Sequence, residues 1–285
     1  MTAFLSTINL ILNLSSIFIQ FLYSLRIYLN IKCVRIAQLL ETKTILFYKD
    51  AAIKIGIGKE HFLCISDLHI GYSPSNIMKI DSRRISILFS EKIKDLCEKT
   101  KSKNLIILGD LKHTIGRITL NEQRSLSLFF SQINPYFKKI YLILGNHDTY
   151  VQNFLPSNVQ IIKKGLLLNN FYLMHGHTLP DPDIKKSNTI IMGHIHPLYS
   201  KENSPLNGQR VWVIIKLYLK QIYSNLMKQY NLIIMPTFNH ELYLPSNYVL
   251  SYNFIGKNSP LLNRCMKDIL STKIISMEGV LLSGT

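Results

Sequence analysis

Short apolar runs alternate with amphipathic segments from about residue 45 onward. Residues 61–66, 104–108 and 139–144 are almost entirely apolar, which predicts three buried strands. Residues 81–101 and 119–133 carry apolar side chains at helical spacing, and Asp81 is placed to cap the first of these helices. The first predicted helix groups Ile85, Leu88, Leu96 and Cys97 on one side. Strands apolar at nearly every position are covered on both faces, so we expect an α/β fold.

Further strand-like runs follow the three strands and two helices. They cover residues 165–174, 188–192, 211–215, 232–235, 248–254 and 273–277. No linker or internal repeat interrupts them. We therefore expect one domain over residues 45–285, preceded by a hydrophobic N-terminal extension over residues 1–44.

Residues 3–25 of that extension carry no charge. Polar residues recur within it at spacings of three and four: Ser6, Asn9, Asn13, Ser16, Gln20 and Ser24. Such a stripe lies along one side of a helix, so the segment suits a membrane anchor or a packing helix. An over-extended reading frame is the third interpretation. No Lys or Arg precedes the apolar run, which argues against a secretory signal.

The composition limits the class of protein without naming a partner. The formal net charge is +16, which permits binding to phosphate-rich molecules, but a bias toward A/T-rich lysine codons would produce the same excess. The four cysteines are widely spaced, at 33, 64, 97 and 265, so neither a disulfide framework nor a cysteine zinc site is expected. A reducing, cytoplasmic location fits best, with membrane association through residues 3–25 as the alternative.

The most informative polar residues come directly after the apolar runs. Five runs end in clusters of Asp, Asn or His: Asp67-Leu-His69, Gly109-Asp110-Leu-Lys-His113, Gly145-Asn146-His147-Asp148, His175-Gly-His177 and Gly193-His194-Ile-His196. In an open α/β sheet, ligands bind outside the carboxyl ends of the strands. The five clusters should therefore meet at one edge, where the three glycines leave room for a ligand.

These clusters offer imidazole nitrogens and carboxylate or amide oxygens without a thiolate. That donor set suits Mn²⁺, which we expect first, with Fe²⁺, Co²⁺, Zn²⁺ or Ni²⁺ as alternatives. Mg²⁺ prefers oxygen ligands alone. The strand ends therefore predict a divalent-metal site.

The ordered set of clusters over residues 61–197 resembles the calcineurin-like metallophosphoesterases. The segment Leu108–His113 is similar to the SbcD-type nucleases, and Ser66–Tyr72 with Met235–Asn239 resemble archaeal SbcD-related phosphoesterases. The resemblance implies a two-sheet β-sandwich flanked by helices (αββα), with the metal site at the carboxyl ends of the strands.

The resemblance also implies a centre of two metal ions. Asp67, His69 and His196 would hold the first ion, Asn146, His175 and His194 the second, and Asp110 would bridge both. His147 would contact the phosphate or protonate the leaving oxygen, with His113 as a second candidate for either role.

Three further residues keep alternative interpretations. Asp148 is placed either to orient the His147 ring or to cap the backbone. His177 could exchange with His175 as a ligand or donate a hydrogen bond at the rim. Arg117 could contact substrate or be a solvated loop arginine.

The implied reaction is hydrolysis of a phosphoester by a hydroxide that the metals hold. We favour a phosphodiester substrate, such as single-stranded or damaged nucleic acid, because of His113 and the basic charge. A phosphatase or cyclic-nucleotide phosphodiesterase acting on a small molecule is the alternative enzyme, and a metal-binding scaffold without turnover is the non-enzyme alternative. Only residues 198–285 follow the last cluster, so the ATPase partner of SbcD-type nucleases is not expected.

Overall fold

The computed structural model describes residues 42–72, 82–224, 226–242 and 259–284. The predicted segment 3–25, the cap Asp81 and the run 248–254 lie outside these ranges. Within them, no helix combines the length and apolar character needed to cross a membrane. The chain divides into two units, and the site described below lies in the larger one, Thr44–Ile55 with Glu60–Thr285.

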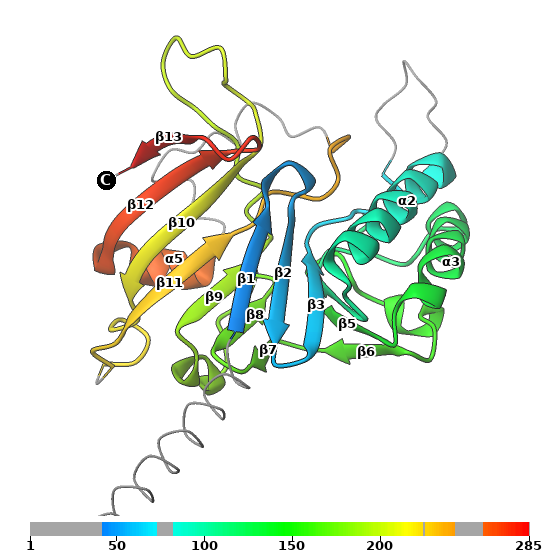
Figure 1. Ribbon diagram of the computed structural model, residues 1–285, viewed down its shortest axis with the longest axis horizontal. Helices are drawn as coiled ribbons and strands as arrows, with labels where there is room; N and C mark the ends of the chain where they lie inside the picture. The colour runs from blue at the N-terminus through cyan, green and yellow to red at the C-terminus, as the bar shows by residue number, and fades with distance from the viewer. Residues whose placement is uncertain (1–41, 73–81, 225, 243–258, 285) are drawn as a thin grey trace, which may run out of the picture. The chain divides into compact units, whose positions relative to one another are not determined.

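The first sheet has the strand order β1-β2-β3-β4-β5-β6 (Figure 1). Its strands are β1 (Thr42–Phe47), β2 (Ala52–Ile57), β3 (Glu60–Ile65), β4 (Asn104–Leu108), β5 (Lys139–Ile143) and β6 (Val159–Ile162). The last four run parallel. The apolar runs correctly predict β3, β4 and β5. They miss β1, β2 and β6, whose apolar positions are interrupted by Lys, Thr or Gln.

The second sheet has the order β13-β12-β10-β11-β9-β8-β7. Its strands are β7 (Gly165–Leu168), β8 (Phe171–Met174), β9 (Thr189–Met192), β10 (Val211–Tyr218), β11 (Gln229–Ile234), β12 (Ile269–Ser276) and β13 (Leu281–Gly284). Strands β8, β9 and β11 are mutually parallel. The predicted single run 165–174 is wrong: it is the hairpin β7–β8, because the chain turns at Asn169 with φ 54°.

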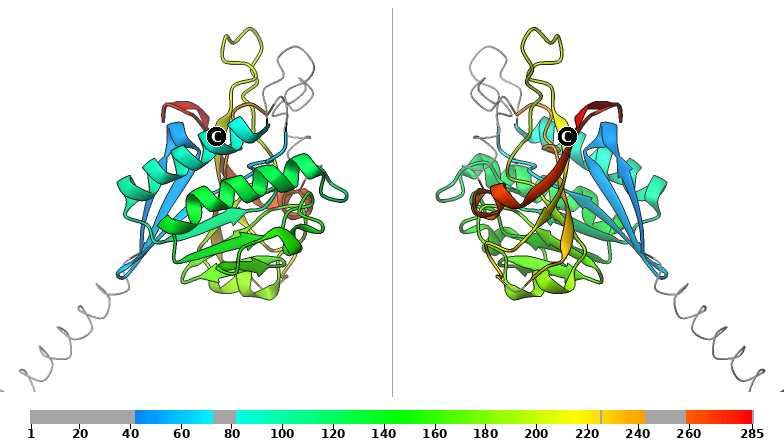
Figure 2. Two further views of the ribbon diagram at one scale, coloured as in Figure 1. Left: turned by 90° about the vertical axis from the view of Figure 1, so that its right-hand side faces the viewer. Right: turned by 90° about the vertical axis from the view of Figure 1, so that its left-hand side faces the viewer.

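Helices α2 (Ser82–Thr100) and α3 (Leu120–Ile133) lie alongside each other on one face of the first sheet (Figure 2). Thr119 caps α3 in a reciprocal capping box with Glu122. The buried apolar stripe of α2 consists of Ile85, Phe89, Ile93, Leu96 and Cys97. Leu88, predicted on this stripe, is 45% exposed because it lies one residue before Phe89 and so off the stripe.

The central strands of both sheets are covered on both faces. In β3 and β4, Leu63 and Leu105 join the core beneath the two helices, whereas the intervening Cys64 and Ile106 point the other way and are buried too. The second sheet packs against α5 (Pro260–Cys265) and shows the same double burial. Short 3-10 helices complete the described chain: η1 (Tyr48–Asp50), η2 (Asn134–Tyr136), η3 (Val151–Phe154), η4 (Pro182–Lys186) and η6 (Met266–Asp268). The two-sheet fold flanked by helices is confirmed.

Candidate metal centre

The predicted metal ligands and His147 come shortly after parallel strands of the two sheets. Asp67 and His69 follow β3, Asp110 follows β4, and Asn146 and His147 follow β5. In the second sheet, His175 follows β8, and His194 and His196 follow β9. The carboxyl ends of parallel strands lie at the same sheet edge, which is why residues far apart in sequence converge.

The backbone at this edge is unusual. Five of the site residues have left-handed φ angles: Asp67 (56°), His69 (47°), Asp110 (49°), His194 (67°) and His196 (47°). Asp and His tolerate this region better than most residues, but each such position still costs on the order of 1 kcal/mol and persists only where its surroundings enforce it. The fold therefore imposes the directions in which these side chains point. The sequence pattern gives no sign of this strain.

Backbone hydrogen bonds join the loops that follow β3 and β4. The His69 amide donates to the Asp110 carbonyl oxygen at 2.9 Å, and the Ile70 amide donates to that of Leu111 at 2.8 Å. The His113 amide donates back to the Ile70 carbonyl oxygen at 3.0 Å. The two loops therefore form a rigid pair that fixes Asp67, His69 and Asp110 together.

Two glycines leave space for neighbouring site side chains rather than for a ligand. A Cβ at Gly109, which has φ +77°, would collide with the His175 imidazole. A Cβ at Gly193 would collide with the Ser66 hydroxyl and the Asp67 carboxylate. The predicted role of these glycines is therefore corrected: they let ligand-type side chains approach the backbone closely.

A first cluster contains Asp67, His69, Asp110 and His196, whose candidate ligand atoms all lie within 4.8 Å of one another. His196 Nε2 lies 3.0 Å from Asp67 Oδ1, and His69 Nε2 lies 3.4 Å from His196 Nε2 and 3.7 Å from Asp110 Oδ2. All four residues are buried. These are the three predicted ligands of the first ion together with the predicted bridge.

A second cluster contains Asp110, His175 and His194 within the same 4.8 Å limit. His175 Nε2 lies 3.3 Å from Asp110 Oδ2 and 3.3 Å from Asn146 Oδ1. The other ring nitrogen, Nδ1, donates to the Leu108 carbonyl oxygen at 2.7 Å, which turns Nε2 toward the centre. Asp110 is thus common to both clusters.

The remaining predicted residues lie around these clusters. The His177 ring is 5.2 Å from that of His175, centroid to centroid, and His177 belongs to neither cluster. Arg117 is exposed in the loop after β4. His113 and His147 form a third group with His69, described next.

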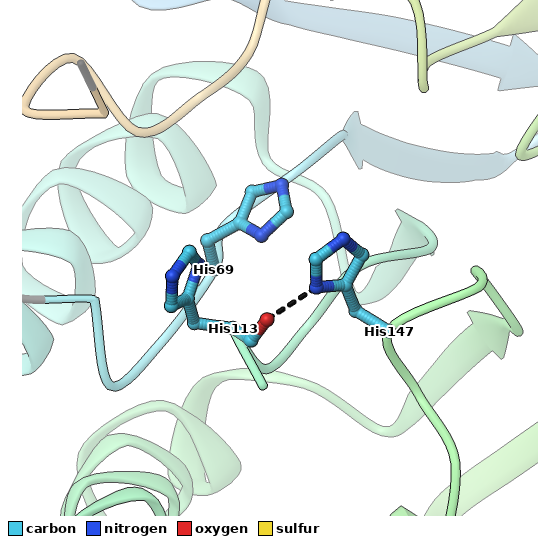
Figure 3. A group of neighbouring side chains, drawn as sticks. All are labelled: His69, His113 and His147. Carbon is cyan, nitrogen blue, oxygen red and sulfur yellow. Dashed lines mark hydrogen bonds between the residues drawn. The ribbon is translucent and has the colours of Figure 1, made fainter. Parts of the chain in front are cut away.

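The rings of His69, His113 and His147 face a common space (Figure 3). His147 Nδ1 is hydrogen-bonded to the His113 carbonyl oxygen, and His147 Nε2 lies 3.9 Å from Asp110 Oδ2. The His147 amide also donates to Asp110 Oδ1 at 3.0 Å. The backbone of His113 therefore holds the His147 ring with Nε2 toward the clusters.

The Asp148 carboxylate does not hold that ring. It accepts hydrogen bonds from the backbone amides of Leu111 (2.8 Å), Lys112 (3.4 Å) and Gly145 (2.8 Å), so its position is that of a backbone cap. Its predicted orienting role is corrected accordingly. Burial, together with the charge of Asp110, raises the pKa of Asp148 to about 6.

The two central carboxylates carry charge deep in the protein. Asp67 is fully buried and Asp110 is 1% exposed, and in the described ranges their ion pairs are all with histidines. Burial is the largest single influence and opposes their ionisation, but the combined attraction of the neighbouring histidines, chiefly His196 for Asp67 and His175 for Asp110, outweighs it and lowers the pKa of each carboxylate. Two buried anions without Lys or Arg partners, surrounded by imidazole nitrogens, fit divalent cations.

The histidines divide by charge state. Burial and the repulsion of His196 lower the pKa of His69 to about 3, while burial and the repulsion of His175 lower that of His194 to about 4. Both rings are therefore neutral at pH 7, as metal ligands must be. Burial alone would lower the pKa of His175 too, but Asp110 and Asp67 raise it to about 9, so this ring would release a proton when a cation binds.

The sequence matches the profile of a family described as calcineurin-like phosphoesterase over residues 60–232, more than half of the chain. The chain belongs to the calcineurin-like phosphoesterase family. It is therefore a metal-dependent hydrolase of phosphoesters, and the resemblance drawn from the strand ends is confirmed at the level of the family. The likeness to SbcD-type and archaeal proteins stays a prediction.

Two solved structures are similar to this phosphoesterase. One is a Pseudomonas putida nuclease, MPE, with 18% identity over 70% of this chain and 88% of that chain, at a TM-score of 0.47. The other is Yfce, a phosphoesterase from E. coli, with 14% identity over 79% of this chain and 97% of that chain, at a TM-score of 0.36. No curated protein matches. The family assignment rests on the profile alone.

Sequence reasoning included two polar residues beside the centre only within the resembling segment Met235–Asn239 and gave them no role. Thr237 and Asn239 follow the parallel strand β11, and both are buried against the loop that carries Asp67. The signal was available, because polar residues also follow this apolar run. It was weaker because neither residue is a typical metal ligand.

Replacing Asp148 by Asn should destabilise the phosphoesterase through the backbone rather than through the metal. An amide has one acceptor oxygen, so at least one of the three buried amides loses its partner, at a cost of about 1–3 kcal/mol. Urea unfolding of the metal-free protein measures this. The matched control is Asp183→Asn, an exposed carboxylate whose ion pair among the described residues is with Lys186, and this variant should change the free energy of unfolding by less than about 0.5 kcal/mol. Equal stability of wild type and Asp148→Asn would contradict the capping role.

Proposed function

We propose that this phosphoesterase is a dinuclear-metal phosphodiesterase that acts on nucleic acid, single-stranded or damaged. The observation that carries the dinuclear centre is the shared Asp110 carboxylate, common to two clusters of candidate ligands. A carboxylate shared by two sets of ligands is suited to bridge two cations about 3.5–4 Å apart. The proposal assigns Asp67, His69 and His196 to one ion and Asn146, His175 and His194 to the other.

The donor set supports Mn²⁺ as the native metal, with Fe²⁺, Co²⁺, Zn²⁺ or Ni²⁺ as alternatives. Two such cations, when bound, acidify a water and neutralise charge that develops on the phosphate oxygens. The protein's own contribution is to hold the ligands in fixed directions, through the left-handed backbone at Asp67, His69 and Asp110.

His147 is the proposed general acid. Its Nδ1 is engaged by the His113 carbonyl oxygen, so Nε2 is the ring atom that can exchange a proton with the leaving oxygen. The ring is only partly buried, which leaves it accessible to substrate.

His113 and His177 are the proposed phosphate contacts. The Nδ1 atom of each is buried and has no hydrogen-bond partner in the described part of the chain. A buried ring nitrogen without a partner carries a desolvation cost that a phosphate oxygen could relieve. Both rings lie beside cluster residues: His113 is 5.5 Å from His69, and His177 is 5.2 Å from His175, between ring centroids.

The rim beside His113 and His147 supports a nucleotide-type substrate. Ile115 is 60% exposed and Tyr150 is 56% exposed, and Arg117, two residues after Ile115, is exposed as well. The Thr149 hydroxyl donates to the Ile115 carbonyl oxygen and so joins the two loops. Tyr150 is three residues from His147, a span of at most about 10 Å. An aromatic face at that reach from a phosphate site suits a stacked nucleobase, and the net charge of +16 favours a polyanion.

Asp110→Asn and His147→Ala should separate metal binding from proton transfer. Asp110→Asn removes the bridging charge, so bound Mn²⁺ should fall below two ions per chain and hydrolysis of bis-p-nitrophenyl phosphate should be abolished. His147→Ala should keep both ions and lower kcat by about 10²- to 10⁴-fold on a dinucleotide, whose leaving alkoxide must be protonated, and much less on bis-p-nitrophenyl phosphate, whose leaving phenolate needs no proton. Elemental analysis after dialysis, with rates on the same samples, checks both. Equal metal loss in the two variants would mean that these roles are misassigned.

The substrate class is tested with two diesters that release the same leaving group. Thymidine 5′-p-nitrophenyl phosphate carries a base, and methyl p-nitrophenyl phosphate carries none. Tyr150→Ala should raise KM for the thymidine diester about tenfold, the size of a lost stacking contact, and leave that for the methyl diester within about twofold. Tyr150→Phe should behave as wild type, because stacking needs the ring and not the hydroxyl.

Met227→Ala is the matched surface control, since Met227 is 71% exposed and far from these loops in sequence. An equal effect of Tyr150→Ala on both diesters would exclude base stacking. Turnover of p-nitrophenyl phosphate alone would favour the small-molecule phosphatase, and no turnover with any divalent metal would leave only the scaffold.

A further inference from the structure

The loop after β11 reaches from the second sheet to the loop that carries Asp67 and His69. The Met235 amide still donates within the second sheet, to the Met192 carbonyl oxygen at 2.8 Å. Three residues later, the Phe238 amide donates to the Ser66 carbonyl oxygen at 2.8 Å, beyond the end of β3 in the first sheet. Residues 235–239, the crossing loop, therefore join the two sheets at the metal centre.

Two side chains of the crossing loop hold backbone carbonyls beside the ligands. The Thr237 hydroxyl donates to the Asp67 carbonyl oxygen at 2.8 Å, and Asn239 Nδ2 donates to that of Leu68 at 3.0 Å. Thr237 is 1% exposed and Asn239 is fully buried, so water cannot replace either donor. Asn239 Oδ1 also accepts from the Glu241 amide at 3.0 Å, which fixes the orientation of its amide group.

The carbonyls that they hold belong to the strained part of the chain. Asp67 and His69 have φ angles of 56° and 47°, and the two carbonyls lie in the peptide groups between them. A carbonyl direction depends on the adjacent φ and ψ angles, so a donor placed to meet it favours one backbone conformation. In an extended continuation of β3, the carbonyls of Asp67 and Leu68 would point elsewhere and the two donors would be left unpaired.

We propose that Thr237 and Asn239 are positioning residues that select the left-handed backbone at Asp67 and His69 and thereby form the half of the metal centre built from Asp67, His69 and His196. This inference rests on the proposed two-ion function and deepens it. It assigns the two residues no contact with metal or substrate. It makes this half of the centre depend on the crossing loop. In the described ranges, no hydrogen bond joins the crossing loop to the residues of the other half, Asn146, His175 and His194.

The crossing loop has other anchors, so removing these two donors should not unfold it. The Phe238 side chain is fully buried in the first core, with its ring 5.7 Å from that of Phe89. Arg210 donates to the Thr237 carbonyl oxygen at 2.6 Å. Asn239→Ala and Thr237→Val remove only side-chain donors and leave these contacts in place.

The test compares these variants with a matched buried threonine. Thr100 is also 1% exposed, and its hydroxyl donates to the Leu96 carbonyl oxygen at 2.6 Å within α2. Urea unfolding of the metal-free proteins gives the stability cost of each substitution. Equilibrium dialysis against Mn²⁺, followed by elemental analysis, gives the number and affinity of bound ions. Thr237→Ser, which restores the hydroxyl, is the rescue variant.

Asn239→Ala and Thr237→Val should each weaken one of the two ions by about 10- to 100-fold, the usual effect of losing a residue that orients metal ligands. Thr100→Val should lose similar stability and keep both affinities, and Thr237→Ser should bind as wild type. Combined with His69→Ala, Asn239→Ala should cause no further loss. The double variant Asn239→Ala with Asn146→Ala should bind neither ion tightly.

Equal metal binding in Asn239→Ala and Thr100→Val would overturn the positioning role, as would an equal weakening of both ions. A wild type that binds a single ion would instead contradict the two-ion function. In that case, a lower affinity for that one ion in Asn239→Ala but not in Thr100→Val would support the positioning role, and equal affinities in the two variants would contradict it.

Discussion

The burial of the Asp110 carboxylate is the constraint on which the rest of the site depends. A negative charge that is 1% exposed needs compensation, which the protonated His175 ring provides at 3.3 Å, while ring nitrogens of His69 and His147 lie 3.7 and 3.9 Å away. The same oxygen, Oδ2, faces His69, His147 and His175, so the position of one carboxylate fixes the relative placement of both clusters. The fold accommodates it by a left-handed turn at Asp110 and by glycine at position 145, where a Cβ would collide with the carboxylate.

The metal centre is also where the two sheets meet. The first sheet supplies Asp67, His69, Asp110 and Asn146, and the second supplies His175, His194 and His196. Neither set alone surrounds Asp110. The five left-handed ligand positions cost stability, and the hydrogen bonds from neighbouring loops and from the crossing loop offset that cost. The family's phosphoesterase chemistry therefore depends on packing between sheets as well as on the ligands themselves.

The sequence predicted the parts of this structure that burial alone decides. Strands β3, β4 and β5 are apolar runs because both of their faces are covered, and the ligand-type residues stand out because they follow such runs. Strands β1, β2, β6 and β13 carry too many polar or exposed positions to be recognised. The role of Asp148 could not be assigned from the sequence, because an aspartate can either cap the backbone or orient a histidine ring. The three backbone amides that donate to its carboxylate decide for the cap. Thr237 and Asn239 do follow an apolar run, but neither is a typical metal ligand, and their contacts with the loop of Asp67 join residues about 170 positions apart, which no local pattern reveals.

The central claim is that two cations share Asp110, and anomalous X-ray scattering from crystals soaked in Mn²⁺ tests it directly. The account predicts two peaks on either side of the Asp110 carboxylate, one beside Asp67, His69 and His196 and the other beside Asn146, His175 and His194. A single peak, or two peaks of which only one contacts Asp110, would contradict it.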